Sequence, residues 1–368
     1  LYERNDIKFR DLKKKINFIS TLKEQKLISI PKSLKISFNS NKNALILFTS
    51  GTTGSPKGVV HSFYSLSSKW KDLKKYFKIT NLKNTLCLLP THFGHGLICN
   101  CLFPLVNGNN LYIFPKFSTS LIFNLGKIID KYKITYMSSV PTLWRIATSH
   151  SKKPKKKSLK LITCGSAPLS EQLWKKIQVW SSQKKVWNTY GITETGSWIA
   201  GTSLKKFIPK DGFIGKQWGS RMVISETKPE KMKTTKNMNN LKINKKIKQG
   251  YIWVNTRAIM KGYYKKKKLT NEVIKNNWFF TGDIGVIKNG NLTLVGRERN
   301  EINVSGIKVI PEDVDMVLEK HKFVDEACTF AEFDKITGEK VVSAVVLSNK
   351  NIKEKSLINF CKKNFSDH

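Results

Sequence analysis

Apolar and polar residues alternate with two different periods along the first half of the chain. Runs rich in Ile, Leu, Val and Tyr that end in turn residues predict five β-strands, at residues 44–48, 85–90, 110–114, 134–141 and 159–165. Between them, residues 120–132 and 170–182 space apolar side chains three or four apart and predict helices, the second starting at Ser170 and Glu171. Strand and helix in alternation predict α/β layers around a mostly parallel sheet.

The pattern changes in the second half of the chain. Residues 221–249 are polar and low in complexity, which predicts an exposed hairpin or a disordered excursion. Three β-rich runs follow, and a KNGN turn joins the last two; they are residues 251–256, 278–287 and 291–296. A strand and a helix opened by Pro311 come after about residue 298, where we place a domain boundary.

Composition limits the class of protein. With 368 residues, 40% of them hydrophobic, the chain is expected to form more than one domain, because single cores stop growing near ~250–300 residues. No apolar run approaches the ~20 residues of a membrane-spanning helix, so no membrane span is expected. The chain starts at Leu1 without a signal-peptide pattern, and we expect the natural start to lie upstream.

The formal net charge of +40 is the most unusual bulk property. Such a charge is compatible with nucleic acid or an anionic membrane as partner. However, only seven of the 66 basic residues are Arg, whereas nucleic-acid readers favour Arg and interleaved aromatic side chains. We therefore interpret the charge as solvated basic loops and expect no specific nucleic-acid partner.

Cysteine and histidine spacing gives no sign of a metal centre. The six Cys form no CxxC pair and lie mostly in apolar contexts, so we expect reduced thiols and a cytoplasmic location rather than a zinc site or a disulfide framework. His92 and His95 are three residues apart, but no second cluster completes a metal shell. A structural or pocket-lining role is expected for both.

The sequence FTSGTTGSPKGV, residues 48–59, begins in the first predicted strand. It is not a Walker A element, because Pro56 stands five residues after Gly51 and Lys57 is followed by Gly58. It still has the parts of an anion-binding loop: glycines turn backbone N–H groups toward a phosphate, hydroxyls donate, and Lys57 supplies charge. Taken alone, such a turn is equally compatible with a linker.

Other motifs decide between these readings. They are VPTLWRI (140–146), CGSAPLS (164–170), NTYGITETG (188–196), DGFIGK (211–216), WFFTGDIG (278–285) and GRERNEINVSGIKVIPEDVD (296–315). Together with the loop, this order and spacing resemble the adenylate-forming enzymes, the family of acyl-CoA synthetases, luciferases and peptide-synthetase adenylation domains. The resemblance covers the chain from about residue 44 to residue 348.

The resemblance implies an incomplete acyl-CoA synthetase-like α/β fold. Residues 1–298 would form a large domain of mixed, mostly parallel sheets layered with helices plus a small β-barrel-like part. Residues 299–368 would form a small α+β domain. The implied activity is ATP-dependent activation of a carboxylic acid to an acyl-adenylate with release of pyrophosphate, followed by transfer to a thiol. ATP, Mg²⁺ and coenzyme A are therefore expected as cofactors and co-substrates, with a small carboxylic acid as substrate.

The resemblance also assigns catalytic residues. A carboxylate and a phosphate repel each other, so adenylation needs charge neutralisation and in-line positioning. Lys57 and Thr193 would contact the phosphates, Thr193 at the α-phosphate. Glu194 would supply a carboxylate for Mg²⁺, which binds oxygen ligands.

Several of the same motifs contain the residues that the resemblance implies for nucleotide binding. Tyr190 offers a flat face for adenine, Asp283 would accept hydrogen bonds from the ribose hydroxyls, and Arg297 would reach the same ribose. The nucleotide-binding set implied by the resemblance is Thr49, Ser50, Gly51, Thr52, Thr53, Gly54, Lys57, Gly165, Ser166, Ala167, Tyr190, Gly191, Thr193, Asp283 and Arg297.

The chain departs from the family pattern at both ends. The family carries well over a hundred residues before its phosphate loop, and its small domain closes with a PxTxxGKxxR-like segment, which is absent from this sequence. We therefore interpret the sequence as an internal fragment, expected to be impaired in adenylation, and Lys362 and Lys363 do not replace the missing Lys. Arg299 takes the hinge position between the two domains.

The acid-binding pocket is the least defined part. Its candidate residues are aromatic or imidazole side chains near the motifs: His92, Phe93, His95, Trp144 and Trp198. No acidic residue for a substrate ammonium is evident, which favours a fatty or aryl acid over an amino acid.

Two alternatives stay open at this point. The chain could load a carrier-protein phosphopantetheine instead of free coenzyme A, which a neighbouring carrier sequence would reveal. It could also be a non-catalytic nucleotide-binding relative or a basic nucleic-acid binder, which salt-sensitive DNA retention without ATP binding would reveal.

Overall fold

The computed structural model describes residues 40–49, 56–114, 118–204, 207–226, 228–229, 249–297, 302–304, 307–334, 338–348 and 352–365. Residues 40–368 form one compact unit. Several predicted features lie outside the described residues: most of the polar stretch at 221–249, and the candidates Ser50, Gly51, Thr52, Thr53, Gly54 and Arg299.

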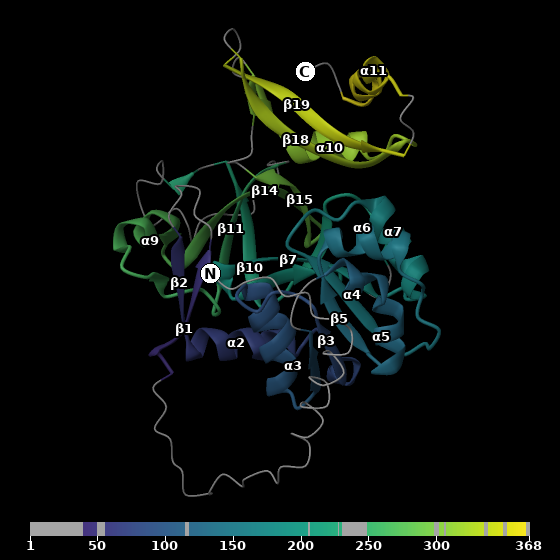
Figure 1. Ribbon diagram of the computed structural model, residues 1–368. Helices are drawn as coiled ribbons and strands as arrows, with labels where there is room; N and C mark the ends of the chain where they lie inside the picture. Colours follow the sequence, from purple (N-terminus) through teal and green to yellow (C-terminus); the bar gives the residue numbers. More distant parts are fainter. Residues whose placement is uncertain are drawn as a thin grey trace, which may run out of the picture. The chain divides into compact units, whose positions relative to one another are not determined.

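A twelve-stranded sheet forms the centre of the fold (Figure 1). Its order is β10-β11-β14-β15-β9-β8-β7-β6-β5-β3-β4, and β13 pairs with β14 beside this path. Its strands are β3 Asn84–Cys87, β4 Asn110–Ile113, β5 Tyr136–Ser139, β6 Leu161–Gly165, β7 Val186–Ile192, β8 Ser197–Gly201, β9 Phe213–Gln217, β10 Ser220–Ser225, β11 Gly250–Thr256, β13 Ile274–Lys275, β14 Trp278–Lys288 and β15 Asn291–Arg297.

The sheet is parallel in only one half. Parallel pairing joins β7, β6, β5, β3 and β4, and the connections between these strands contain helices, as parallel strands require. The remaining described pairs are antiparallel. A tight turn joins β14 to β15, with both Asn289 and Gly290 at positive φ, as in a two-residue hairpin turn. This is the KNGN turn predicted from the sequence.

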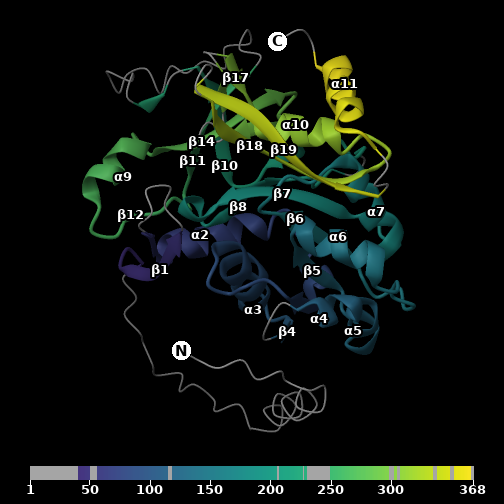
Figure 2. The ribbon, with the colours of Figure 1, turned by 45° about the horizontal axis from the view of Figure 1, so that its top comes forward.

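Helices cover both faces of the parallel half (Figures 1 and 2). Apolar residues of α4, α5, α6 and α7 pack on one face, and those of α2, α3 and the π-helix η2 pack on the other. The helices of this part are α2 Phe63–Leu73, η1 Ile79–Leu82, η2 His95–Leu102, α3 Phe103–Val106, α4 Thr119–Phe123, α5 Leu125–Lys131, α6 Pro141–His150 and α7 Glu171–Ser181. No helix in the described part of the chain is long and apolar enough to cross a membrane.

Of the two helices predicted in this part of the chain, one is confirmed and the other is not. The helix predicted at 170–182 is confirmed, and Ser170 Oγ accepts from the Leu173 N–H at its start. The single helix predicted at 120–132 is wrong, because α4 and α5 are separated at Asn124. A close approach accompanies this break: a Cβ on Gly126 would lie 2.1 Å from the Lys152 carbonyl oxygen.

A separate three-stranded antiparallel sheet stands next to the predicted phosphate loop. Its order is β1-β2-β12, with β1 Asn43–Thr49, β2 Lys57–Ser62 and β12 Gly262–Tyr263. Helix α9 Lys267–Val273 follows β12. The sheet brings residues about 200 positions apart in the sequence side by side, since Tyr263 pairs with Val59.

A four-stranded sheet, β17-β16-β19-β18, follows the central sheet in the sequence. Its strands are β16 Ile302–Val304, β17 Ile307–Val309, β18 Val324–Asp334 and β19 Gly338–Leu347, and the helices of this part are α10 Pro311–Leu318 and α11 Glu354–Asn364. Pro311 begins α10, as predicted. Arg145 of α6 forms ion pairs with Glu319 over 2.6 Å and with Glu326 over 3.3 Å. The predicted domain boundary at residue 298 stays a prediction.

Truncating Trp174 in the core is expected to lower stability strongly. Trp174 on α7 is fully buried, and its indole N–H donates to the Val186 carbonyl over 2.8 Å. Trp174→Ala should lower the free energy of unfolding by about 3–5 kcal/mol. Trp174→Phe keeps a ring in the site and should cost less. Urea unfolding of both variants checks this, and equal losses would contradict it.

Candidate active site

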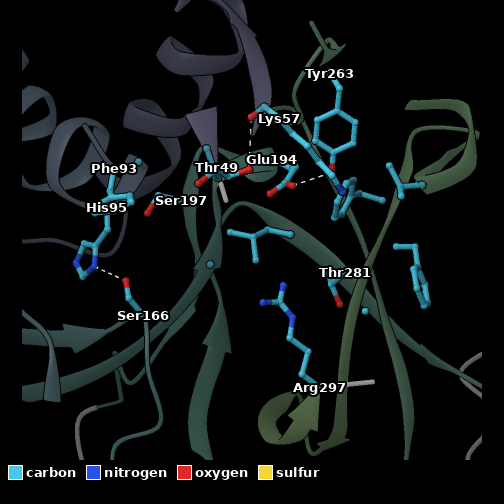
Figure 3. A pocket seen from close by; sticks show the side chains of 18 of the residues that line it. Thr49, Lys57, Phe93, His95, Ser166, Glu194, Ser197, Tyr263, Thr281 and Arg297 are labelled. Atoms are coloured by element: carbon cyan, nitrogen blue, oxygen red, sulfur yellow. Dashed lines mark hydrogen bonds between the residues drawn. The ribbon is translucent and has the colours of Figure 1, made fainter. Parts of the chain in front are cut away.

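A cavity of about 1220 Å³ brings together residues that lie far apart in the sequence, from Thr49 to Arg297 (Figure 3). Seven residues of the predicted nucleotide-binding and catalytic sets line it: Thr49, Lys57, Ser166, Gly191, Thr193, Glu194 and Arg297. Phe93 and His95, predicted for the acid pocket, line it as well. One cavity therefore holds both the predicted nucleotide site and part of the predicted acid site.

A short turn carries the two predicted catalytic residues Thr193 and Glu194. Strand β7 ends at Ile192, and the turn η3 Thr193–Thr195 follows and closes at Gly196, whose φ of +68° favours glycine. The Gly196 N–H donates to the Thr193 carbonyl over 3.0 Å. The Met260 N–H donates to the Glu194 carbonyl over 2.8 Å. The turn is therefore anchored at both carbonyls.

His61 holds the same turn from the three-stranded sheet. Its Nε2 lies 2.8 Å from the Thr193 carbonyl and its Nδ1 lies 3.1 Å from Ser65 Oγ. Burial lowers the pKa of His61 to about 4, so the ring is neutral near pH 7. Because a carbonyl only accepts, Nε2 carries the proton, and the unprotonated Nδ1 faces the Ser65 hydroxyl, which also lies within hydrogen-bond distance of the Ser62 carbonyl. Sequence reasoning missed His61, since only the fold brings it to Thr193.

Glu194 and Lys57 meet at Tyr263, which the sequence analysis also missed. The Tyr263 hydroxyl donates to Glu194 Oε1 over 2.8 Å, and Lys57 Nζ lies 5.5 Å from the centroid of the Tyr263 ring (Figure 3). Lys57 begins β2, and Pro56 before it is the first described residue after Thr49. The positive and negative side chains predicted for ATP therefore share one aromatic neighbour.

Asp283 contacts both Tyr190, which was predicted for the adenine, and Arg297, which was predicted for the ribose. Its Oδ2 accepts from the Tyr190 hydroxyl over 2.5 Å, and its Oδ1 pairs with Arg297 Nε over 2.9 Å. Burial raises the pKa of Asp283, while the Arg297 guanidinium opposes that shift. Arg297 lines the cavity, whereas Tyr190 and Asp283 are buried beside it. The pair thus fixes the position from which Arg297 reaches the cavity.

His95 is buried at the predicted acid end of the cavity. Its Nδ1 lies 2.7 Å from Ser166 Oγ and its Nε2 lies 2.6 Å from Ser138 Oγ. Burial lowers the pKa of His95 to about 4, so one ring nitrogen donates and the other accepts. Phe93, by contrast, is half exposed on the cavity wall. This end combines an apolar surface with a fixed polar network.

Comparison with known proteins places this geometry in a family. The sequence profile described as AMP-binding enzyme matches residues 6–264. The chain belongs to the AMP-binding enzyme family. Oxalate–CoA ligase from Arabidopsis thaliana is 30% identical to it over 331 residues, covering 88% of this chain and 61% of that protein. Acyl-CoA synthetase 7 from Caenorhabditis elegans is also 30% identical, covering 86% and 58%.

Solved structures share the fold of this AMP-binding enzyme. ATP-bound MatB from Rhodopseudomonas palustris has a TM-score of 0.76 at 24% identity, with 90% of this chain and 63% of that chain covered. MenE from Bacillus subtilis, in complex with ATP and magnesium ion, has a TM-score of 0.73 at 25% identity, with 89% and 65% covered. The chain thus spans about three-fifths of its relatives' length.

Some of the predicted residues do not line the cavity. Trp198 is 2% exposed and stacks on Phe77, with ring centroids 5.6 Å apart, and Trp144 is fully buried in the core. His92 is exposed and contacts the Phe93 ring instead of lining the cavity. Gly165 and Ala167 flank Ser166 without lining the cavity themselves. Of residues 165–167, Ser166 is the one on the cavity wall.

The residues present fit the Mg²⁺ that the family implies. Among the described residues, no group of three or more His, Cys, Asp or Glu could hold a metal ion. Mg²⁺ in nucleotide sites needs no such group, because one or two carboxylates and the substrate phosphates suffice. Glu194 lines the cavity, and its carboxylate accepts from Tyr263 at Oε1. The site therefore offers the single oriented carboxylate that such binding requires.

Protonation of His95 is expected to destabilise the protein in acid. Its pKa is about 4 when folded and 6.5 as the unperturbed value, so the unfolded chain binds more protons between those pH values. Stability from the neutral ring is complete above pH 6.5 and declines as pH falls toward 4. The stability difference between wild type and His95→Gln should therefore shrink over this window, by up to about 1.4 kcal/mol per pH unit. Urea unfolding at pH 7, 6 and 5 measures it, and a constant difference would refute the assignment.

Proposed function

We propose that the protein activates a carboxylic acid with ATP and then forms a thioester. In the first step a carboxylate oxygen bonds to the α-phosphorus of ATP, and the bond between that phosphorus and the pyrophosphate oxygen breaks. In the second step a thiolate sulfur bonds to the acyl carbon, and AMP leaves. The observation that carries the proposal is the cavity that unites Lys57, Thr193 and Glu194 with His95 and Phe93.

The phosphate end supports the adenylation step. Lys57 supplies positive charge, and the anchored turn presents the Thr193 hydroxyl and the Glu194 carboxylate to the same space. Mg²⁺ bound through Glu194 would neutralise charge on the phosphate oxygens. Preorganised groups of this kind cost no reorganisation during reaction, which is the main source of catalysis in nucleotidyl transfer.

The substrate is proposed to be a fatty or aryl acid, with short dicarboxylic acids included in the test. The Phe93 surface favours an apolar acid, whereas the His95 network could bind a polar substituent. One relative is named as an oxalate–CoA ligase, which is why short diacids belong in the panel.

Coenzyme A is proposed as the acceptor, and the cytoplasm as the location. The homologous proteins are named as CoA ligases and acyl-CoA synthetases, whereas a carrier protein remains an alternative acceptor. The six free cysteines agree with a reducing compartment. Mixing the acyl-adenylate with free coenzyme A or with a phosphopantetheinylated carrier protein distinguishes the two acceptors.

Pyrophosphate exchange tests the proposal directly. The protein at its natural length is incubated with ATP, Mg²⁺, labelled pyrophosphate and one acid at a time, from oxalate through aryl acids to long-chain fatty acids. Label should enter ATP only with a matching acid. Absence of exchange with every acid, together with absence of ATP binding, would refute the function.

A further inference from the structure

Tyr263 contacts two of the three side chains assigned to the phosphate end. Its hydroxyl donates to Glu194 over 2.8 Å, while the Lys57 ammonium lies 5.5 Å from the ring centroid (Figure 3). Tyr263 is 7% exposed and lines the cavity. A single residue thus touches both the carboxylate and the ammonium that face ATP in the proposed function.

The backbone of Tyr263 is fixed on both sides. In β12 it pairs with Val59 of β2, and its N–H donates to Thr270 Oγ1 over 2.8 Å. Its ring belongs to a buried cluster with Val59, Met260 and Phe279. Because the ring is packed and the main chain is paired, the hydroxyl has a defined position. The Tyr263 hydroxyl can therefore determine the orientation of a neighbouring side chain.

The hydroxyl sets the direction of the Glu194 carboxylate. Among the described residues, this carboxylate accepts a side-chain hydrogen bond only from Tyr263, at Oε1. A hydrogen bond to an ionised group is shorter and stronger than one between neutral groups. Holding Oε1 in this way fixes the rotation of the carboxylate, so that Oε2 has one orientation.

The ring acts on Lys57 by a different interaction. The face of an aromatic ring carries partial negative charge and attracts an ammonium placed within about 6 Å of its centroid. Lys57 follows the loop that resembles the family's phosphate loop, and its side chain is almost fully buried. The ring therefore holds the ammonium near the cavity wall.

We propose that Tyr263 is a positioning residue for adenylation, which orients Glu194 toward Mg²⁺ through its hydroxyl and Lys57 toward the phosphates through its ring. The inference rests on the proposed function, because it assumes that ATP and Mg²⁺ bind in this cavity. The two contacts make different predictions, since one substitution removes the hydroxyl alone and another removes hydroxyl and ring together.

Calorimetric ATP titrations of the protein at its natural length, with Mg²⁺ and with EDTA, test the two contacts separately. Tyr263→Phe should raise the Mg²⁺ concentration for half-maximal enhancement of ATP binding about tenfold, because one charge-assisted hydrogen bond is lost. Its ATP affinity in EDTA should equal that of wild type. Tyr263→Leu should weaken ATP binding in EDTA as well, since the Lys57 ammonium loses its ring.

Tyr264→Phe is the matched control. Tyr264 is the next residue along the chain and is 43% exposed, and its ring lies near Lys265. This variant should bind ATP like wild type in both conditions. Melting temperatures of all variants show whether Tyr263→Leu remains folded. If Tyr263→Leu is unfolded, the result for Tyr263→Phe decides the test.

The outcomes separate this inference from the function on which it rests. Wild-type binding that depends on Mg²⁺, with an unchanged Tyr263→Phe, overturns the role of Tyr263 alone. A Tyr263→Phe variant that loses ATP affinity equally with and without Mg²⁺ overturns it too, because that indicates a general packing role. Wild type that binds no ATP overturns the proposed function and the inference with it.

Discussion

Glu194→Gln is expected to lower pyrophosphate exchange by at least about 100-fold. The amide has the same shape as the carboxylate, and its oxygen can still accept from the Tyr263 hydroxyl. The turn itself is held through backbone atoms by His61 and Met260, so its conformation should survive. The loss of pyrophosphate exchange then measures the effect of removing the negative charge of Glu194, which Mg²⁺ binding needs. Exchange is measured at saturating acid across a range of Mg²⁺ concentrations.

A matched control for this variant is Glu171→Gln. Glu171 is a partly exposed carboxylate at the start of α7, where it pairs with Lys175 over 2.6 Å. Surface pairs of this kind contribute at most about 1 kcal/mol to stability, so exchange should stay at the wild-type rate. Exchange by Glu194→Gln within twofold of wild type would remove Glu194 from the chemistry.

Asp283→Asn is expected to weaken ATP binding by roughly tenfold or more. The carboxylate accepts from Tyr190 at one oxygen and pairs with Arg297 at the other. Neutralising it leaves Arg297 without its ion pair and lengthens or redirects the Tyr190 bond. A hydrogen bond to a charged group is worth about 1.5–3 kcal/mol, and here two partners depend on one carboxylate. Calorimetric titration with ATP gives the dissociation constant.

Asp325→Asn provides the comparison for Asp283→Asn. Asp325 is exposed on β18, in the C-terminal sheet, and its substitution should leave ATP affinity unchanged. The kinetics offer a second check, because Asp283→Asn should raise KM for ATP more than it lowers kcat. Equal ATP affinities for Asp283→Asn and wild type would show that Arg297 needs no partner to reach the nucleotide.

Local signals in the sequence predicted the start of α7 and eight strands, β1, β3, β4, β5, β6, β11, β14 and β15. The helix start at Ser170 depends only on neighbouring residues, and its side-chain bond to Leu173 is the expected cap. The break between α4 and α5 was missed because its accompanying contact is not local. Gly126 meets the backbone of residues 152–154, and nothing near it in the sequence marks that approach.

The family motifs predicted several residues that line the cavity. They did not predict the residues that hold those side chains and their turn in place. Thr193 and Glu194 stand in one recognisable motif. Their supports are distant in sequence, since His61 lies 132 positions from Thr193 and Tyr263 lies 69 positions from Glu194. Each support is a single common residue type without a motif of its own. Only the pairing of β2 with β12 brings them together.

The direction of the Trp198 side chain could not be predicted from the sequence, for a different reason. Its position just after the GITETG motif made it a reasonable candidate for the acid pocket. Successive side chains of a strand point to opposite faces, and β8 begins at Ser197, which lines the cavity. Trp198 therefore points to the other face and joins the core. The sequence could not fix this register, because β7 carries a bulge at Tyr190 and Gly191 opposite β8.

The two ends of the cavity rest on different parts of the fold. Lys57 and Tyr263 stand on the small β1-β2-β12 sheet, which also holds the turn Thr193–Thr195 through His61. His95, Ser138 and Ser166 come from η2 and from the ends of the parallel strands β5 and β6. Substitutions around His95 need not disturb the contacts around Lys57 and Tyr263. In the proposed function, such a division would let related enzymes diversify the acids they accept while they keep the same nucleotide chemistry, and it marks a line along which homologues can be recombined.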